Sequence, residues 1–163
     1  MLIFTDGSFS KKPKMAGMGA VIIDRDREFT VGNYSDSCRD NNVAEVAAIA
    51  MAIQYIRDKR IVDKTKDKTI TIISDSQYAL RRITGSQPGR SEFEQKCLDY
   101  IHDFLDETNK KVTFFQVKGH LHDGNKFSRY NNIADHIAGE YREYGLQLYR
   151  SQMNIIVNKK GKR

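Results

Sequence analysis

The chain has 163 residues, which is long enough for one domain with a sizeable core, and it shows no internal repeat. With 39% apolar and 29% charged residues, the composition is that of a globular protein, and no apolar stretch reaches the ~20 residues that span a bilayer. Five of the 27 basic residues and none of the 21 acidic residues lie in residues 150–163, so most of the net charge of +6 belongs to the C-terminal tail.

Strand patterns come first along the chain. Residues 2–6, 18–24 and 28–34 are rich in apolar and β-branched side chains, and the short polar turn "RDR" predicts that the last two form a hairpin. Together they predict an antiparallel meander of three strands. Residues 41–59 are rich in alanine and free of glycine and proline, which predicts a buried helix with Asn41 as its N-cap.

The second half of the chain alternates between strand and helix patterns. Residues 69–74 predict a fourth strand, and "SQYALRRI" predicts a short helix after it. An amphipathic helix is predicted from Ser91, which would form a capping box with Glu94. The remaining predicted segments are a fifth strand over 111–117, a polar loop over 118–131 and a final helix over 132–145.

This order of elements predicts an α/β fold. Because crossovers through a helix favour parallel strands, we expect a mixed five-stranded sheet with helices on both faces. Strands 1–3 would be antiparallel, and strands 4 and 5 would be parallel to strand 1. We expect residues 1–149 to form this single domain. The basic tail, residues 150–163, is either a flexible end or contains an extra strand or docked segment around residues 153–157, and its charge favours polyanions.

Acidic residues stand where predicted strands end. Asp6 follows the first strand and Asp75 follows the fourth, so in parallel neighbouring strands they would lie about 5 Å apart. Carboxylates that close together repel each other unless a cation lies between them. Glu45 on an apolar helix and Asp135 at a helix start add two more acids. Each acid alone is explained by a turn, a helix cap or a helix dipole, but the combination predicts one acidic site.

Six short motifs follow one another along residues 2–145. They are "TDGS" (Thr5–Ser8), "GMGAVI" (Gly17–Ile22), "NNVAE" (Asn41–Glu45), "SDSQY" (Ser74–Tyr78), "VKGH" (Val117–His120) and "NNIAD" (Asn131–Asp135). In this order they resemble the type I ribonuclease H family, which cuts the RNA strand of RNA–DNA hybrids.

The resemblance implies the fold of that family and a metal-dependent endonuclease that leaves 5′-phosphate and 3′-hydroxyl ends. It implies that two Mg²⁺ ions, or Mn²⁺ as a substitute, are held by Asp6, Glu45, Asp75 and Asp135. Carboxylate oxygens are the ligands that such hard cations prefer, and paired ions suit in-line displacement at phosphorus.

The resemblance also assigns a catalytic histidine and contacts with the hybrid. His120 matches the family histidine that transfers a proton or helps product leave, and His122 is a rival for this role. The hybrid contacts must include groups that recognise the 2′-hydroxyl of RNA. The residues implied are Gly7, Ser8, Lys12, Asn41, Asn42 and Gln77.

The chain departs from the family pattern at Asp40, where a Thr or Ser usually contacts a DNA phosphate. A carboxylate there would repel the phosphate, and we expect Lys12 to offset or pair with it. The segment between Arg82 and Lys96 also lacks the dense basic helix of some members, and the basic tail is expected to substitute for it.

Two other functions stay open: a non-catalytic nucleic-acid-binding module, and a DNA-directed nuclease of the same superfamily. The presence of all four acids argues against the first, and the asparagine pair with "SDSQ" argues against the second. Cys38 and Cys97 lie far apart without metal-site spacing, and because the chain starts directly with a strand pattern we expect no signal peptide. We therefore expect a cytoplasmic monomer with free thiols and no membrane contact.

Overall fold

The computed structural model describes residues 1–85, 87–118 and 125–160, with side chains in the last helix described as far as Met153. No helix in these ranges is long and apolar enough to cross a membrane. In chain order the elements are β1 (Leu2–Lys11), β2 (Lys14–Asp24), β3 (Arg27–Ser35), α1 (Asn41–Asp58), α2 (Ile61–Lys64), β4 (Thr69–Ser74), α3 (Gln77–Thr84), α4 (Glu92–Glu107), β5 (Lys111–Gln116) and α5 (Lys126–Lys160).

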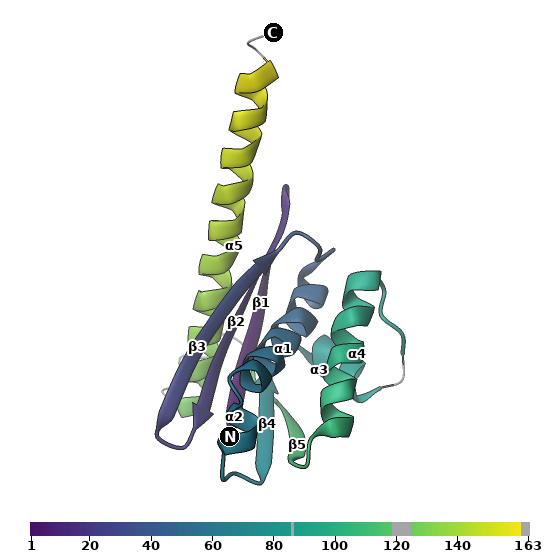
Figure 1. The fold of residues 1–163 in the computed structure, drawn as a ribbon, viewed down its shortest axis with the longest axis vertical. Helices are drawn as coiled ribbons and strands as arrows, with labels where there is room; N and C mark the ends of the chain where they lie inside the picture. The colour runs from purple at the N-terminus through teal and green to yellow at the C-terminus, as the bar shows by residue number, and fades with distance from the viewer. Residues whose placement is uncertain (86, 119–124, 161–163) are drawn as a thin grey trace.

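The strands form one sheet in the order β3-β2-β1-β4-β5 (Figure 1). β1, β2 and β3 are antiparallel neighbours, whereas β4 is parallel to both β1 and β5. The predicted mixed sheet is therefore confirmed. Phe4 of β1 pairs with Ile73 of β4, so Asp6 and Asp75 each follow two residues after this pair.

Helices cover both faces of the sheet (Figure 1). On one face, α1, α3 and α4 pack around a core rich in isoleucine, which includes Ile3 of β1, Ile53 of α1 and Ile72 of β4. On the other face, α5 packs against a smaller core in which Phe4 meets Ala134. Side chains alternate along a strand, so β1 contributes Ile3 to one core and Phe4 to the other.

Glycines allow α1 and α5 to approach the sheet closely. Gly7 of β1 faces α1, and an added methyl carbon there would lie 2.5 Å from the backbone nitrogen of Glu45. Gly17 and Gly19 of β2 face α5, and a methyl carbon at either would overlap carbonyl oxygens of that helix. These small residues therefore set how close the helices that carry Glu45 and Asp135 come to the sheet.

β1 is longer than predicted and does not end at Asp6. Its pairing with β4 stops at Phe4, but its pairing with β2 continues to Lys11 because the two strands form a long hairpin. Asp6 therefore lies within β1, at the point where the strand loses β4 as a neighbour. Beyond this point one edge of β1 is left open.

α5 is also longer than predicted. It begins at Lys126, inside the predicted loop, and it continues through residues 153–157, where an extra strand was one expectation. The rings of Phe127 and Tyr130 explain the early start, because their centroids lie 5.6 and 5.3 Å from that of Phe4 on the sheet. The C-terminal part of α5 extends beyond the other elements (Figure 1).

Helix starts differ from the predicted ones in detail. The N-cap of α1 is Asp40 rather than Asn41, and its carboxylate accepts a hydrogen bond from a backbone N–H three residues on, at 3.0 Å. Ser91 caps α4 as predicted, but the side chain of Glu94 accepts a hydrogen bond from the backbone N–H of Arg90 instead of closing the capping box. The short helix α2 was not predicted.

Candidate active site

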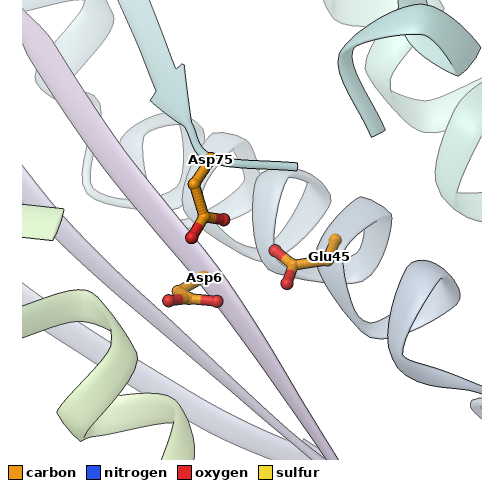
Figure 2. Close-up of side chains that lie close together, drawn as sticks. All are labelled: Asp6, Glu45 and Asp75. Atoms are coloured by element: carbon orange, nitrogen blue, oxygen red, sulfur yellow. The ribbon is translucent and has the colours of Figure 1, made fainter. Parts of the chain in front are cut away.

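Three carboxylates from separate elements meet at the open edge of β1 (Figure 2). Asp6 comes from β1, Glu45 from α1, and Asp75 from the residue after β4. Each offers a carboxylate oxygen, and the three oxygens lie within 4.8 Å of one another. The sequence prediction that the two strand ends and the first helix bring their acids together is consistent with this geometry.

Burial makes this arrangement electrostatically costly. Asp6 and Glu45 are each only 5% exposed. Burial, with the nearby charges of Asp75 and Asp135, raises the pKa of Asp6 to about 7. Burial and the charge of Asp6 likewise raise the pKa of Glu45 well above its usual range. Without a cation, the site therefore favours protonated carboxyl groups.

Hydrogen bonds orient the Glu45 carboxylate at both of its oxygens. The backbone N–H of Gly7 donates to Oε2 at 3.1 Å, and the side-chain amide of Asn41 donates to Oε1 at 3.2 Å. The Gly7 N–H also donates to Oδ1 of Asp6 at 2.7 Å. Contacts of this kind fix the orientation of carboxylates that ligate metals.

Asp135 joins the other acids from the opposite side of the sheet. It lies on α5, and its charge contributes to the raised pKa of Asp6. All four acids line one cleft of about 430 Å³. The other residues that line this cleft are Gly7, Ser8, Asn41, Asn42 and Ser76.

The acidic cluster fits hard divalent cations such as Mg²⁺ or Mn²⁺. These ions prefer carboxylate oxygens, and three such oxygens converge here. Within the described parts of the chain, no lysine or arginine pairs with Asp6 or Glu45 to neutralise them. A bound cation would relieve the repulsion that raises the pKa of both acids.

The structure brings only part of the predicted hybrid-binding set to the cleft. Lys12 is exposed in the turn between β1 and β2, and Gln77 is exposed at the first residue of α3, so neither lines the cleft. The predicted catalytic His120 and its rival His122 lie outside the described residues. The predicted hybrid contacts that do line the cleft are Gly7, Ser8, Asn41 and Asn42.

Two residues beside the acidic cluster were not among the predicted site residues. Ser76 lines the cleft and caps α3, because its hydroxyl accepts a hydrogen bond from the Ala79 N–H at 3.2 Å. Arg142 of α5 donates to the Ser8 hydroxyl at 2.8 Å and lines an open hollow of about 650 Å³ that includes Ser8 and Asp135. Asp135 and Arg142 are two helical turns apart on one helix face, a spacing that could have indicated Arg142.

Asp40 is paired with arginine rather than with Lys12. Nη2 of Arg90 lies 3.2 and 3.1 Å from the two carboxylate oxygens of Asp40, and Nε of Arg39 lies 3.7 Å from one of them. In the described chain no ion pair joins Lys12 to Asp40. The cations that offset this carboxylate are therefore its chain neighbour Arg39 and Arg90, which lies just before α4.

Comparison with known proteins adds a family match and several relatives. The sequence model of the family described as RNase H matches residues 1–143. The uncharacterised protein YpeP of Bacillus subtilis is 31% identical over 119 residues, which cover 71% of this chain and 51% of YpeP, so this chain spans about half of that protein. The ribonuclease H of Chlorobaculum parvum is 26% identical over 138 residues, which cover 83% of this chain and 90% of that enzyme.

Solved structures share the fold at lower sequence identity. LC11-RNase H1, solved in complex with an RNA/DNA hybrid, superposes with a TM-score of 0.69 at 22% identity and covers 89% of this chain and 98% of its own. The N-terminal RNase H domain of Rv2228c from Mycobacterium tuberculosis superposes with a TM-score of 0.67 at 16% identity, covering 91% and 96%. Both likenesses show that this chain shares the fold of these domains.

Proposed function

We propose, from the premise that the chain belongs to the ribonuclease H family of hydrolytic nucleases, that it cuts the RNA strand of RNA–DNA hybrids. The observation that carries this proposal is the meeting of Asp6, Glu45 and Asp75 within 4.8 Å, in a cleft that Asp135 also lines. The hybrid bound to LC11-RNase H1, a protein of the same fold, supports this class of substrate.

The four acids would hold two Mg²⁺ ions, with Mn²⁺ as a substitute. Bound there, the cations would supply an activated water, orient the scissile phosphate and stabilise the departing oxygen. The products of this hydrolysis would carry a 5′-phosphate and a 3′-hydroxyl. The chain's own part is to hold the ligands in place. The paired strands β1 and β4 position Asp6 and Asp75, while the Gly7 N–H and the Asn41 amide orient Glu45.

Residues at the rim of the cleft would recognise the hybrid. Asn42 is exposed beside the acids, and an amide that both donates and accepts hydrogen bonds suits a 2′-hydroxyl. Ser8, held by Arg142, would contact the same strand. Lys12 and Gln77, outside the cleft, would contact the hybrid further from the scissile bond. The N–H of Gly7 donates to Asp6 and Glu45. The Asn41 amide donates to Glu45 and would also contact the hybrid.

His120 is the proposed proton-transfer residue, on the resemblance of its motif alone. Residues 1–149 would form the catalytic domain, and the basic residues 150–163 would add non-specific attraction to the nucleic-acid backbone. One copy of the chain carries all four acids, which supports a monomer. The free thiols of Cys38 and Cys97 support a reducing compartment such as the cytoplasm.

The proposal is tested by incubating the protein with an end-labelled RNA–DNA hybrid, double-stranded RNA and double-stranded DNA in Mg²⁺ or Mn²⁺. We expect cleavage of the RNA strand of the hybrid alone, with 5′-phosphate and 3′-hydroxyl ends, and none after chelation of the metal. Cleavage of double-stranded DNA instead would indicate a DNA-directed nuclease. Hybrid binding without cleavage in either metal would indicate a non-catalytic binding module.

A further inference from the structure

Glu94 of α4 is a fully buried carboxylate outside the acidic cluster. Its Oε1 accepts a hydrogen bond from the Tyr78 hydroxyl at 2.5 Å, and its Oε2 accepts one from the backbone N–H of Arg90 at 2.6 Å. The guanidinium groups of Arg82 and Arg90 lie 3.9 and 3.7 Å from it. A buried carboxylate is costly unless it is paired and hydrogen-bonded, and breaking one such contact is expensive. The contacts of Glu94 therefore restrain Tyr78, Arg82 and Arg90.

Tyr78 connects Glu94 to the first turn of α3. It is the second residue of that helix and follows Asp75 by three residues. Its ring also lies 4.6 Å from the guanidinium of Arg90 and 5.2 Å from that of Arg82, and Arg82 Nε donates to its hydroxyl at 2.9 Å. Burial and the hydrogen bond to Glu94 raise the pKa of Tyr78, so its hydroxyl remains a donor at neutral pH.

Arg90 connects Glu94 to the start of α1. Its Nη2 lies 3.2 and 3.1 Å from the two carboxylate oxygens of Asp40, which is the N-cap of α1. The next residue, Asn41, donates to Oε1 of Glu45 at 3.2 Å. A continuous chain of contacts therefore leads from the buried carboxylate to a member of the acidic cluster. Its members are Glu94, Arg90, Asp40, Asn41 and Glu45.

We propose that Glu94, acting through Tyr78 and Arg90, is a positioning residue for the acidic cluster. It connects α4 to the first turns of α1 and α3. Of these helices, α1 carries Glu45 and α3 follows Asp75 in the chain. These two acids come from separate parts of the chain, so their relative placement depends on contacts between the helices. The inference rests on the proposed function in one respect, because it takes divalent metal binding as the property that the placement serves.

Two variants interrupt these contacts at different points. Arg90→Gln removes the guanidinium that joins Glu94 to Asp40, while Asp40 remains able to cap α1. Tyr78→Phe removes only one hydroxyl and keeps the ring against which Arg90 packs. The second variant is the gentler one, so it keeps the proposal testable if Arg90→Gln folds poorly.

A matched control lies at the opposite ends of the same two helices. Arg57 of α1 and Glu107 of α4 form an ion pair of 2.8 Å, far from the cluster in both helices. Arg57→Gln therefore breaks an α1–α4 contact of similar chemistry without touching the first turn of α1. This variant shows how the loss of an α1–α4 ion pair away from the cluster affects the protein.

The first measurement is the affinity for Mn²⁺ by titration calorimetry, without nucleic acid. We expect Arg90→Gln to weaken binding on the order of 10-fold, the low end for residues that orient metal ligands, and Tyr78→Phe to weaken it by less. Arg57→Gln should change the affinity by less than about 2-fold, because its pair is exposed and lies far from the first turn of α1. The second measurement is amide hydrogen exchange in the metal-free protein. Arg90→Gln should speed exchange in the first turn of α1, and Tyr78→Phe should speed it in the first turn of α3.

The proposal is overturned if Arg90→Gln and Tyr78→Phe match Arg57→Gln in both measurements. If the wild type binds no Mn²⁺, the exchange rates alone decide. Unchanged rates at the start of α1 in Arg90→Gln and at the start of α3 in Tyr78→Phe then overturn it. Neither measurement uses a hybrid, so a wild type that cuts no hybrid contradicts the proposed function while the positioning role is judged separately. An active enzyme whose Arg90→Gln variant keeps its Mn²⁺ affinity and exchange rates contradicts the positioning role alone.

Discussion

At Asp6, burial and the neighbouring carboxylates act in the same direction and raise the pKa to about 7. The metal-free site therefore holds a proton near neutral pH, and a divalent cation that binds there competes with that proton. Glu45 is shifted in the same direction by the same causes. Without metal, burial and mutual repulsion destabilise the ionised carboxylates of the cluster, and a bound cation would relieve this repulsion.

This shift predicts how stability depends on pH. Asp6 binds its proton more tightly in the folded protein, with a pKa of about 7, than in the unfolded chain, where the pKa is about 4. Lowering the pH through this range therefore favours the folded state. We expect this group to raise the free energy of unfolding of the metal-free protein by on the order of 2 kcal/mol between about pH 8 and pH 5.

Urea denaturation at the two pH values, with a chelator present, measures this effect. Asp6→Asn is the comparison, because it removes the titrating group and also lowers the repulsion on Glu45. The variant should be more stable than the wild type at the higher pH, and its stability should change less with pH. An equal pH dependence in both proteins would contradict the assignment of the shift to Asp6.

Among the elements, α5 depends on glycine for its position. Gly17 and Gly19 of β2 leave no room for a side chain beneath the helix, whereas Gly139, within α5 itself, has nothing near the position that a methyl carbon would occupy. Substitution by alanine is therefore expected to destabilise the protein at Gly17 and Gly19 and to be tolerated at Gly139. Since α5 carries Asp135, its distance from β2 also sets where that acid lies.

We expect Gly19→Ala to destabilise the protein by about 3 kcal/mol, because the helix backbone must move away from the sheet. Gly139→Ala should stabilise it by about 0.5–1 kcal/mol, because alanine is the better residue within a helix. Chemical denaturation measures both, and Mn²⁺ titration shows whether Gly19→Ala also weakens metal binding by displacing Asp135. Equal stability of the two variants would contradict the close approach of α5 to β2.

The sequence predicted elements where the local pattern decides the structure. The isoleucine run of β4 and the alanine-rich α1 form as expected, and the acids that follow strand patterns, Asp6 and Asp75, lie close together. The sequence did not predict features that depend on distant partners. β1 extends past Asp6 because β2 pairs with it, and α5 starts early because Phe127 packs on Phe4. Glu94 matches a local capping pattern but bonds to Tyr78 instead.

Across the whole molecule, the sheet order places the acidic cluster where β1 continues and β4 ends. The two helical layers then each bring one acid, with α1 on one face carrying Glu45 and α5 on the other carrying Asp135. Four segments far apart in the sequence thus form one cleft. The predicted domain boundary at residue 149 falls within the continuous α5 and stays a prediction.

Deleting residues 150–163 tests both this boundary and the role of the basic end. The described side chains there, Arg150–Met153, are exposed, so the free energy of unfolding should change by less than about 1 kcal/mol. Binding to a hybrid should become less dependent on salt, with the slope of log K against log salt falling by about 0.9 for each phosphate that the tail contacts. An unchanged slope would remove the tail from the nucleic-acid interface.

Catalysis at the acidic cluster is tested by single-turnover cleavage of an RNA–DNA hybrid by the wild type and by Asp75→Asn at saturating Mg²⁺. Asp75 offers one of the three oxygens that converge in the cluster. We expect the wild type to cut the RNA strand only when metal is present. The variant should be slower by more than about 100-fold, the upper end for residues that only orient metal ligands, with circular dichroism showing both folded. Cleavage by Asp75→Asn at the wild-type rate, or by the wild type in chelator, would contradict catalysis at this cluster.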